Sequence, residues 1–534
     1  MTDVRTGWPL LVACVLALAA LQLWLRPLLP VDETRYLSVA WEMWLRGDFL
    51  VPYLNGEPYS HKPPLLFWMI HGLWRVFGVS EWSPRLLPVA WSLLALWWSA
   101  LLARRLWPAD RAAVSLVPWL LFGSVFWMNF YTLVQFDLLL VLAALGAWLG
   151  IWCARDTPGR GWLLVALAIG LGVLSKGPVI LVPVLPALLL APWWQPSAPP
   201  GGWLRWYLGG SAAVLTGAGI ALAWAVPAGQ TGGDAYREAI FWGQSAGRLV
   251  QSFAHRSPWW WYLVWLPLMC LPWVSWPAVW RGFSRLSVRD SGVRFCLAIL
   301  LPSLLVFSLI SGKQGKYLLP LLPLLAMLAA RALVTAFAAD ARLRIWPAGV
   351  LLGVGGVVLT YLPWWSQGPA WTDRVPAYWG PVLLLLSFPF FSFRLPRQAA
   401  VRGLALAVAL GTATLYAGVV DRMAPQYRLQ PLATQLAGLQ RQGRALAWLG
   451  NYHGQFQFLG RLQQPVTALR QPGSLRAWLA AHPQGYVLVR YPDIRPAVPD
   501  RLPVYLYRSG ALVLWPAQVL LRSPERLDAL AGNA

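Results

Sequence analysis

Charged residues are scarce in this chain, and acidic residues are the scarcest. Asp, Glu, Lys and Arg make up 12% of the 534 residues, with 20 acidic side chains against 43 basic ones. A soluble domain carries roughly 25% charged residues. Half that value over this length excludes an ordinary soluble protein, and the hydrophobic fraction of 58% indicates a polytopic α-helical membrane protein instead.

Cysteine is also rare, and its positions exclude a disulfide framework. The four cysteines are Cys14, Cys153, Cys270 and Cys296. All lie in or beside apolar runs, so we expect buried free thiols. The stretch before Cys14 superficially resembles a lipoprotein cleavage box, but the apolar run continues to Leu25 and too little precedes the cysteine. We therefore expect an uncleaved membrane anchor.

Long apolar runs fill the first four fifths of the chain. A membrane span needs about 20 mostly apolar residues, and about thirteen runs are candidates by this measure. They are 8–25, 85–103, 113–130, 136–153, 162–175, 178–194, 206–226, 259–280, 295–311, 317–335, 346–364, 379–393 and 403–420. The segment 64–77 is also apolar but too short to span, and His71 and Arg75 interrupt it. An interfacial helix is expected there.

Basic residues gather in alternate loops between these runs. They include Arg104, Arg105, Arg111, Arg155, Arg160, Arg205, Arg281, Arg285, Arg289, Arg294, Arg331, Arg342, Arg344, Arg394, Arg397 and Arg402. This positive-inside pattern predicts a cytoplasmic N-terminus and, with an odd number of spans, a periplasmic C-terminus. Much of the net charge of +23 is then explained by basic residues that set the membrane topology. Nucleic acid is therefore not an expected partner.

The loop after the first run carries an unusual concentration of both charges. It reads PVDETRYLSVAWEMWLRGDFLVPYLNGEPYSHKPPLL over residues 30–66. A carboxylate such as Asp32, just beyond the end of a span, can act as a general base, a metal ligand or a partner for a cation. Lys62 is expected at the membrane surface, where it either neutralises a lipid phosphate or extends to headgroups. Ordinary ion pairs in a solvated loop remain the alternative interpretation.

The tail, 421–534, differs in composition from the rest of the chain. Charged residues and glutamine are more frequent there, and the apolar runs are shorter. Helical spacing occurs in 432–442 and 474–482. The segments predicted as strands are 444–450, 485–490, 503–508 and 511–516. These patterns predict a small α/β domain on the outer face, in which no catalytic motif is evident.

Several motifs resemble one known family. The first loop contains DETRY, GDFLVPYLNG and YSHKPPL, and later stretches follow in order: Phe136-Asp137, LSKG at 174–177, FWGQSAGRLVQSFAHRSPWWWYLVWLPLMCLPW at 241–273, FSLISGKQGKYLLPLLPLLAML at 307–328 and DRMAPQ at 421–426. Together they resemble bacterial C-type glycosyltransferases of the protein-mannosyltransferase-like superfamily, and most of all the aminoarabinose transferases that modify lipid A. The resemblance covers roughly residues 1–430.

This resemblance implies an architecture and a reaction. The expected fold is a C-type glycosyltransferase (GT-C) domain over 1–420, with a catalytic first periplasmic loop at 26–84, a second functional loop at 227–258, and a periplasmic α/β domain at 421–534. The implied enzyme sits in the bacterial inner membrane among membrane lipids and is expected to be a monomer. It transfers a sugar, with inversion, from a polyprenyl-phosphate donor to lipid A or a related envelope lipid.

The resemblance also assigns roles to individual residues. Asp32 is expected to act as the base, or to orient and stabilise if the acceptor is an already ionised phosphate, with Asp137 in support. Cations must meet the negative charge that gathers on the leaving phosphate. The candidates are Lys62, Lys176 and Arg256, followed by Arg248 and Lys313. Tyr317 either lines the donor pocket or is a tyrosine of the interfacial belt.

One departure from the family concerns a metal. Where the relatives read Glu-Lys-Pro, this chain reads His61-Lys62-Pro63. The family's acid helps to hold a divalent ion with the histidine that corresponds to His255. Two imidazoles suit Zn²⁺, so His61 and His255 are candidate ligands of a structural zinc ion. The alternative is two interfacial histidines bonded to backbone or lipid phosphate.

Two other functions remain open at this stage. One is the same chemistry on a protein or polysaccharide acceptor, which the sequence does not distinguish from a lipid acceptor. The other is a transporter of polyprenyl-linked lipids. A transporter should place ionisable residues inside its spans near the bilayer midplane, whereas here they cluster at the outer span ends, which favours surface chemistry.

Overall fold

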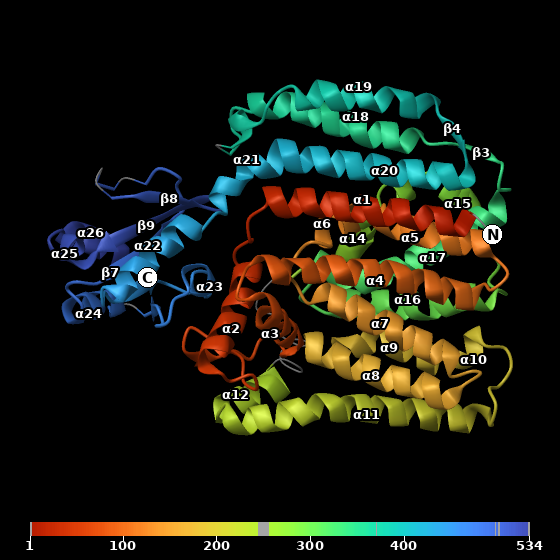
Figure 1. Cartoon of the computed structure of the whole chain (residues 1–534), viewed down its shortest axis with the longest axis horizontal. Coiled ribbons are helices and arrows are strands. Elements are labelled where there is room, and N and C mark those ends of the chain that lie inside the picture. Colours follow the sequence, from red (N-terminus) through yellow and green to blue (C-terminus); the bar gives the residue numbers. More distant parts are fainter. Residues whose placement is uncertain are drawn as a thin grey trace.

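In the computed structural model, long helices run side by side between two ends of the molecule (Figure 1). The structure describes residues 3–243, 256–369, 371–471, 473–496, 498–499 and 502–531. The N-terminus lies at one end, together with the hairpin of β3 (Arg342–Arg344) and β4 (Arg394–Pro396). At the other end lie α2 (Asp32–Arg46), α3 (Leu65–Phe77), α12 (Asp234–Glu238) and the C-terminal tail.

Long helices between these ends account for most of the predicted spans. They are α1 (Asp3–Leu25), α4 (Trp82–Leu106), α5 (Arg111–Phe122), α7 (Asp137–Cys153), α8 (Pro158–Lys176), α9 (Leu181–Leu189), α11 (Gly202–Thr231), α16 (Ser291–Leu309), α17 (Leu322–Ala336), α18 (Trp346–Tyr361), α19 (Trp379–Ser392) and α20 (Arg397–Leu415). Within the described residues, eight helical segments are long and apolar enough to cross a membrane, and five shorter apolar helices accompany them. The polytopic membrane fold is thus confirmed, while the count of thirteen spans stays a prediction.

Some predicted spans are broken rather than continuous. The run 113–130 divides into α5 and α6 (Val125–Phe130) at Gly123, where an added Cβ would lie 2.5 Å from the ring of Trp273. The run 259–280 divides into α14 (Trp261–Met269) and α15 (Pro277–Phe283), and the run 178–194 into α9 and α10 (Ala191–Trp194). Proline explains part of this, because it removes a backbone donor and clashes with the preceding turn. The expected interfacial helix at 64–77 is α3.

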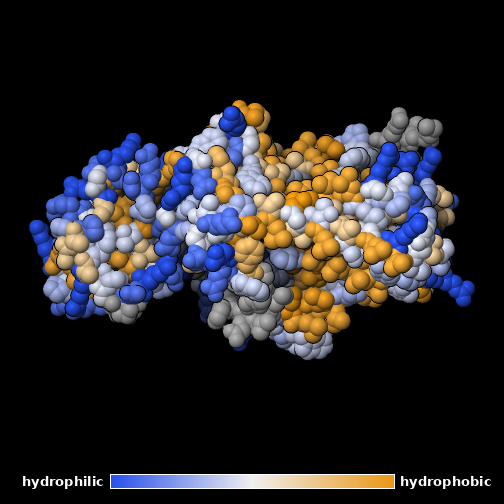
Figure 2. Space-filling model, turned by 90° about the horizontal axis from the view of Figure 1, so that it is seen from below, coloured by the Kyte–Doolittle hydropathy of each residue, from blue (hydrophilic) through white to orange (hydrophobic). Residues whose placement is uncertain are grey.

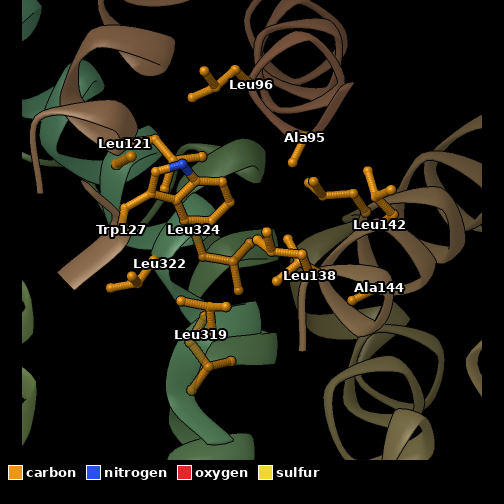
Figure 3. Close-up of a cluster of buried hydrophobic side chains, with 14 of the residues drawn as sticks. Ala95, Leu96, Leu121, Trp127, Leu138, Leu142, Ala144, Leu319, Leu322 and Leu324 are labelled. Atoms are coloured by element: carbon orange, nitrogen blue, oxygen red, sulfur yellow. The ribbon is translucent and has the colours of Figure 1, made fainter. Parts of the chain in front are cut away.

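The interior of the helical part is an apolar core. Figure 3 shows Trp127 of α6 among leucines from α5, α7 and α17, and its indole Nε1 donates to Ser92 Oγ of α4 at 2.9 Å. Large apolar side chains on the outside, such as Leu208 and Leu215 of α11 and Leu305 of α16, stay exposed. Figure 2 shows the resulting hydrophobic band, with hydrophilic residues on the tail and at the opposite end. An exposed band of this kind is what lipid tails cover.

Small residues let neighbouring helices approach closely. An added Cβ at Gly161 of α8 would lie 2.4 Å from the backbone nitrogen of Ala154 after α7, and one at Gly217 of α11 would lie 2.8 Å from Ile169 of α8. Such contacts drive helix association where no hydrophobic effect operates between helices. The cysteines are free thiols as predicted, although only Cys296 is buried and the other three are half-buried.

Arg331, which was predicted in a basic loop, lies within α17 and forms ion pairs that link three helices. The Arg331 guanidinium pairs with Asp110 at 2.7 Å and with Asp290 at 3.0 Å, and Asp290 also accepts from the Trp107 indole at 2.9 Å. These residues join the starts of α5 and α16 to α17. Arg331 therefore stabilises the helix packing at this end of the bundle.

The tail forms three layers around a five-stranded sheet of order β6-β5-β7-β9-β8. The strands are β5 (Leu446–Leu449), β6 (Thr467–Leu469), β7 (Tyr486–Tyr491), β8 (Val504–Tyr507) and β9 (Gly510–Pro516). The first three are parallel, and β9 runs antiparallel to β7 and β8. One face packs on α22 (Gln430–Arg441) and α23 (Gln457–Gly460), the other on α24 (Ser474–Ala481), α25 (Ala517–Leu521) and α26 (Pro524–Ala531). All four predicted strands are present, and β6 is the strand that the sequence analysis missed.

The tail contacts the first loop through specific hydrogen bonds. Asn55, between β1 (Tyr53–Leu54) and β2 (Glu57–Pro58), donates to the Val466 carbonyl at 2.9 Å and accepts from the Val466 amide at 2.8 Å. Trp41 of α2 donates to the Leu462 carbonyl at 3.1 Å. The rings of Trp74 and Phe458 stack at 5.4 Å. These contacts fix the tail over α2 and α3.

A buried ion pair fixes the start of α2. Arg26, just after α1, pairs with Glu33 in the first turn of α2, and their side chains are 3% and 0% exposed. Glu33 also accepts from the Leu29 and Val134 amides, both at 2.9 Å, and Arg26 donates to the Thr132 carbonyl at 3.0 Å. The pair therefore connects α1, α2 and the segment before α7.

Replacing Glu33 with alanine would leave the Arg26 guanidinium buried without its counter-charge. Losing one partner of a buried pair costs about 3–5 kcal/mol, so we expect Glu33→Ala to lower the thermal unfolding midpoint of the detergent-solubilised protein clearly. The control is Asp234→Ala, which removes one carboxylate of an exposed pair with Arg237 and should leave the midpoint near wild type. Equal midpoints for the two variants would contradict the structural role of Glu33.

Candidate functional site

Charged side chains from four separate segments converge at the end of the bundle that carries the tail. Asp32 lies in the first turn of α2, and Asp137 lies in the first turn of α7. Lys176 is the last residue of α8, and Lys316 lies in the 3₁₀ turn Gly315–Leu321 that leads into α17. Each residue is at a helix end, where the chain leaves the apolar band and a charge is tolerated.

Asp32 is held by two cations. Its carboxylate lies 2.6 Å from the guanidinium of Arg35, one turn further along α2, and 3.2 Å from Lys316 Nζ. Lys316 Nζ also lies 3.3 Å from Gln135 Oε1. The Asp32 side chain remains 35% exposed, so the carboxylate is ordered by its partners and still accessible to a substrate.

Asp137 and Lys176 form a second, more deeply buried pair. Lys176 Nζ bonds to Asp137 Oδ1, and the two side chains are 7% and 4% exposed. Lys176 Nζ also lies 4.6 Å from the centre of the Tyr317 ring, a cation–π contact. Because Tyr317 directly follows Lys316, the two ion pairs belong to one connected cluster.

The surroundings of Asp32 favour its ionised form. Burial raises the pKa of Asp32, but the charges of Lys316 and Arg35, and the hydrogen bonds that both donate, outweigh burial and hold the pKa below its usual range. A carboxylate with a lowered pKa is a weak base. Asp32 is therefore better suited to orienting a substrate or stabilising positive charge than to removing a proton.

Lys62 lies at the edge of this cluster. Its Nζ is 5.7 Å from the centre of the Phe136 ring, and Phe136 directly precedes Asp137. The side chain is half-buried on the segment that leads into α3. The structure thus places Lys62 beside the residue that precedes Asp137, and its phosphate-binding role stays a prediction.

Other predicted residues lie elsewhere or in different surroundings. Lys313 is 4% exposed, and its Nζ donates to the Ile310 carbonyl at 2.6 Å and the Ser257 carbonyl at 3.0 Å, so it braces the backbone of two segments. Arg256 is exposed and its backbone pairs with Gly312 in an antiparallel bridge. Arg248 lies outside the described residues.

The predicted zinc site is not seen in the described part of the chain. His61 is exposed, with its ring 5.2 Å from that of Tyr59. Among the residues that the structure describes, no three His, Cys, Asp or Glu side chains gather in a group that could hold a metal ion. His255 lies outside the described residues. Because one of the two predicted ligands lies outside the described residues, the zinc site stays a prediction.

Sequence reasoning missed two members of the cluster, Lys316 and Arg35. Both lie in motifs from which other residues were predicted as site residues. Arg35 is the arginine of DETRY, and Lys316 is the second lysine of GKQGKY. The first lysine of that stretch, Lys313, was chosen instead. The available signal was the position of Lys316 directly before Tyr317, at the start of an apolar run.

Comparisons with known sequences agree with the resemblance that the motifs carry. The family model of dolichyl-phosphate-mannose-protein mannosyltransferases matches residues 61–226. An undecaprenyl phosphate-α-4-amino-4-deoxy-L-arabinose arabinosyl transferase of Pseudomonas fluorescens (strain Pf0-1) is 32% identical over 367 residues, which cover 66% of this chain and 63% of that protein. The enzyme of the same name from Pseudomonas aeruginosa (strain LESB58) is 34% identical over 336 residues, which cover 61% and 58%. The chain therefore matches less than two thirds of the length of these relatives.

Solved structures match over almost the whole chain. The crystal structure of ArnT from Cupriavidus metallidurans bound to undecaprenyl phosphate has a TM-score of 0.75 at 18% identity, covering 95% of this chain and 98% of that one. The apo structure of the same protein has a TM-score of 0.73 at 20% identity, covering 96% and 98%. The chain therefore shares the fold of these solved structures. By sequence it is similar to the undecaprenyl-phosphate aminoarabinose transferases, which confirms the resemblance carried by its first loop.

A double-variant comparison tests whether Asp137 and Lys176 depend on each other. Asp137→Asn removes the counter-charge of a buried ammonium, so we expect a clear loss of thermal stability in detergent. Asp137→Asn with Lys176→Met removes both charges and should recover most of that loss. If the double variant were as unstable as Asp137→Asn alone, the unpaired Lys176 ammonium would not be the cause of the lost stability.

Proposed function

We propose that this protein is an integral-membrane glycosyltransferase that moves a sugar from an undecaprenyl-phosphate donor to lipid A. The names of its relatives point to 4-amino-4-deoxy-L-arabinose as the sugar. The observation that carries the proposal is the linked cluster of Asp32, Lys316, Asp137 and Lys176, placed where the helices end beneath the tail. The positive-inside pattern supports a periplasmic position for this end and a cytoplasmic N-terminus.

The charge balance of the cluster suits an anionic donor. Four cations, Lys62, Lys176, Lys316 and Arg35, accompany two carboxylates, Asp32 and Asp137. Transfer breaks the bond between the sugar's anomeric carbon and the phosphate oxygen, so the departing lipid phosphate gains negative charge. Ordered cations in a partly buried site stabilise that charge more than water does. We assign this task to Lys62 and Lys176, with Arg256 and Arg248 as further candidates from the second loop.

The carboxylates act on the sugar side of the reaction. As the bond to phosphate breaks, the sugar develops oxocarbenium character, which a nearby carboxylate stabilises. Asp32 is accessible and ionised, so it is the carboxylate assigned to this role. If the acceptor is a phosphate, it is already ionised and needs no base, which agrees with the lowered pKa of Asp32. Asp137 then acts through Lys176, as a positioning residue.

A protein acceptor is the second candidate, favoured by the name of the family whose model matches 61–226. The chemistry at the donor would be the same, and only the acceptor would differ. A transporter is less well supported, because the described cluster lies at helix ends and not at their middle. Mass spectrometry of lipid A from cells with and without the gene separates these functions.

Asp32→Asn and Lys62→Ala should each abolish transfer while the protein stays folded. Loss of one interaction made in the transition state costs on the order of 10²–10³ in rate. The measurement is the modified fraction of lipid A by mass spectrometry, at equal membrane expression. Glu57→Gln, an exposed change in β2 of the same loop, is the control and should modify lipid A normally. Wild-type modification in both site variants would refute the assignment.

Removing the charge of Lys316 should change the pH dependence of transfer. Lys316 helps to hold the pKa of Asp32 low, so the carboxylate stays ionised, and active, as the pH falls to that lowered pKa. In Lys316→Met the pKa rises, so the acidic limb of the pH–rate profile should move to higher pH. Lys313→Met, whose ammonium faces backbone carbonyls, should not move that limb. An unmoved limb in Lys316→Met would exclude Asp32 as the titrating group.

A further inference from the structure

One amide side chain in the charged cluster takes no part in the reaction proposed above. Gln135 lies in the short segment before α7, between two buried residues. The amide of Val134 donates to Glu33 Oε1 at 2.9 Å, and the ring of Phe136 packs edge-on against that of Tyr36 at 5.0 Å. The backbone on both sides of Gln135 is therefore fixed, and its side chain extends from an ordered segment.

Lys316 connects Gln135 to Asp32. Its Nζ lies 3.3 Å from Gln135 Oε1 and 3.2 Å from Asp32 Oδ2. An ammonium group only donates hydrogen bonds, so the amide atom that faces it must be the oxygen. Because one ammonium nitrogen holds both acceptors, the ends of the Gln135 and Asp32 side chains lie close together around it.

The amide nitrogen of Gln135 remains as a hydrogen-bond donor. Among the groups that the structure describes, Gln135 Nε2 donates to none, and it is not one of the buried polar atoms that lack a partner. The side chain is half-buried. Since Oε1 is held by Lys316, Nε2 on the same carbon points away from that ammonium and stays accessible. A few fixed polar groups of this kind orient a ligand in a binding site.

Gln135 and Asp32 together match a hydroxyl group better than a phosphate. A hydroxyl both donates and accepts, so it can donate to the Asp32 carboxylate and accept from Gln135 Nε2. A phosphate oxygen in the same place would be repelled by the like charge of Asp32. The side chain of Asp32 is 35% exposed, which leaves it open to such a contact.

The position of Asp32 in the proposed reaction indicates which hydroxyl lies within reach. Asp32 is assigned to the anomeric carbon, where positive charge develops. The nearest hydroxyl is then the one on the neighbouring carbon of the sugar ring. In glycoside hydrolysis, hydrogen bonds to this hydroxyl strengthen in the transition state, so a donor fixed beside Asp32 would contribute both to binding and to rate.

We propose that Gln135 binds the hydroxyl group next to the anomeric carbon of the transferred sugar, through a hydrogen bond from its amide nitrogen. This inference rests on the proposed function and extends it, because it names a residue that recognises the sugar and not the lipid phosphate. Lys62 and Lys176 then serve the phosphate, while Gln135 and Asp32 contact the sugar. Gln135 thereby makes the site selective for a sugar that carries this hydroxyl.

The test is equilibrium binding of three lipids to the purified full-length protein in nanodiscs of uncharged lipid. They are the complete undecaprenyl-phosphate sugar donor, its 2-deoxy analogue, and undecaprenyl phosphate alone. Wild type should bind the complete donor more tightly than the deoxy analogue. In Gln135→Met this affinity ratio should fall about five- to ten-fold, the effect of one lost hydrogen bond, while undecaprenyl phosphate alone should bind as it does to wild type.

Gln135→Glu separates a contact with the sugar from a contact with Lys316 alone. A glutamate keeps an oxygen that faces Lys316 but has no N–H to donate, so the affinity ratio should fall as in Gln135→Met. Both variants conserve side-chain size and leave Asp32 as the partner of Lys316, so their thermal midpoints should stay near wild type. Gln464→Met changes an exposed glutamine of the tail and is the matched control, which should keep the wild-type ratio.

The possible outcomes distinguish this contact from the reaction itself. A wild-type ratio in either Gln135 variant would overturn the proposal, as would equal wild-type affinity for the two donors. Weaker binding of undecaprenyl phosphate alone by Gln135→Met would assign the amide to the phosphate and also overturn it. The same protein is then given the complete donor with lipid A. A wild type that shows the Gln135-dependent ratio but transfers no sugar would refute the proposed function and leave the sugar contact supported.

Discussion

The buried pair of Arg26 and Glu33 is the interaction on which the site depends. It connects the end of α1 and the start of α2 to the segment before α7. In that segment the Val134 amide donates a hydrogen bond to Glu33. Successive residues of a helix point about 100° apart, so burying Glu33 directs its neighbour Asp32 outward. Arg35 and Lys316 then meet Asp32 at its exposed side. A fixed first turn of α2 is thus the condition for an ordered carboxylate.

The sequence predicted which segments contribute to the charged cluster, but not which of two neighbouring residues takes part in it. The motif DETRY offers two adjacent carboxylates, and only packing shows that Glu33 is structural whereas Asp32 is accessible. The stretch GKQGKY offers two lysines. In the structure, Lys313 Nζ donates hydrogen bonds to two backbone carbonyl groups, whereas Lys316 Nζ pairs with the Asp32 carboxylate. These outcomes depend on contacts between residues far apart in the chain, which periodicity cannot reveal.

The sequence predicted some features of the fold better than others. Apolar runs predict membrane helices well, because each helix must satisfy its own backbone within lipid. The breaks inside 113–130 and 259–280 were not predicted, because proline and glycine inside membrane helices are often tolerated. In the tail, hydrophobic patterning revealed four strands, while β6, with three residues and only partial burial, carried too little pattern to detect.

We propose that this membrane protein by itself transfers a sugar from a polyprenyl-phosphate donor to lipid A. Reconstitution tests this most directly: purified protein in nanodiscs, undecaprenyl-phosphate-linked 4-amino-4-deoxy-L-arabinose as donor, and lipid A as acceptor, with products followed by mass spectrometry. We expect lipid A to gain the sugar while undecaprenyl phosphate is released in equal amount. Donor that remains intact beside lipid A, or donor that is consumed while lipid A stays unchanged, would contradict it.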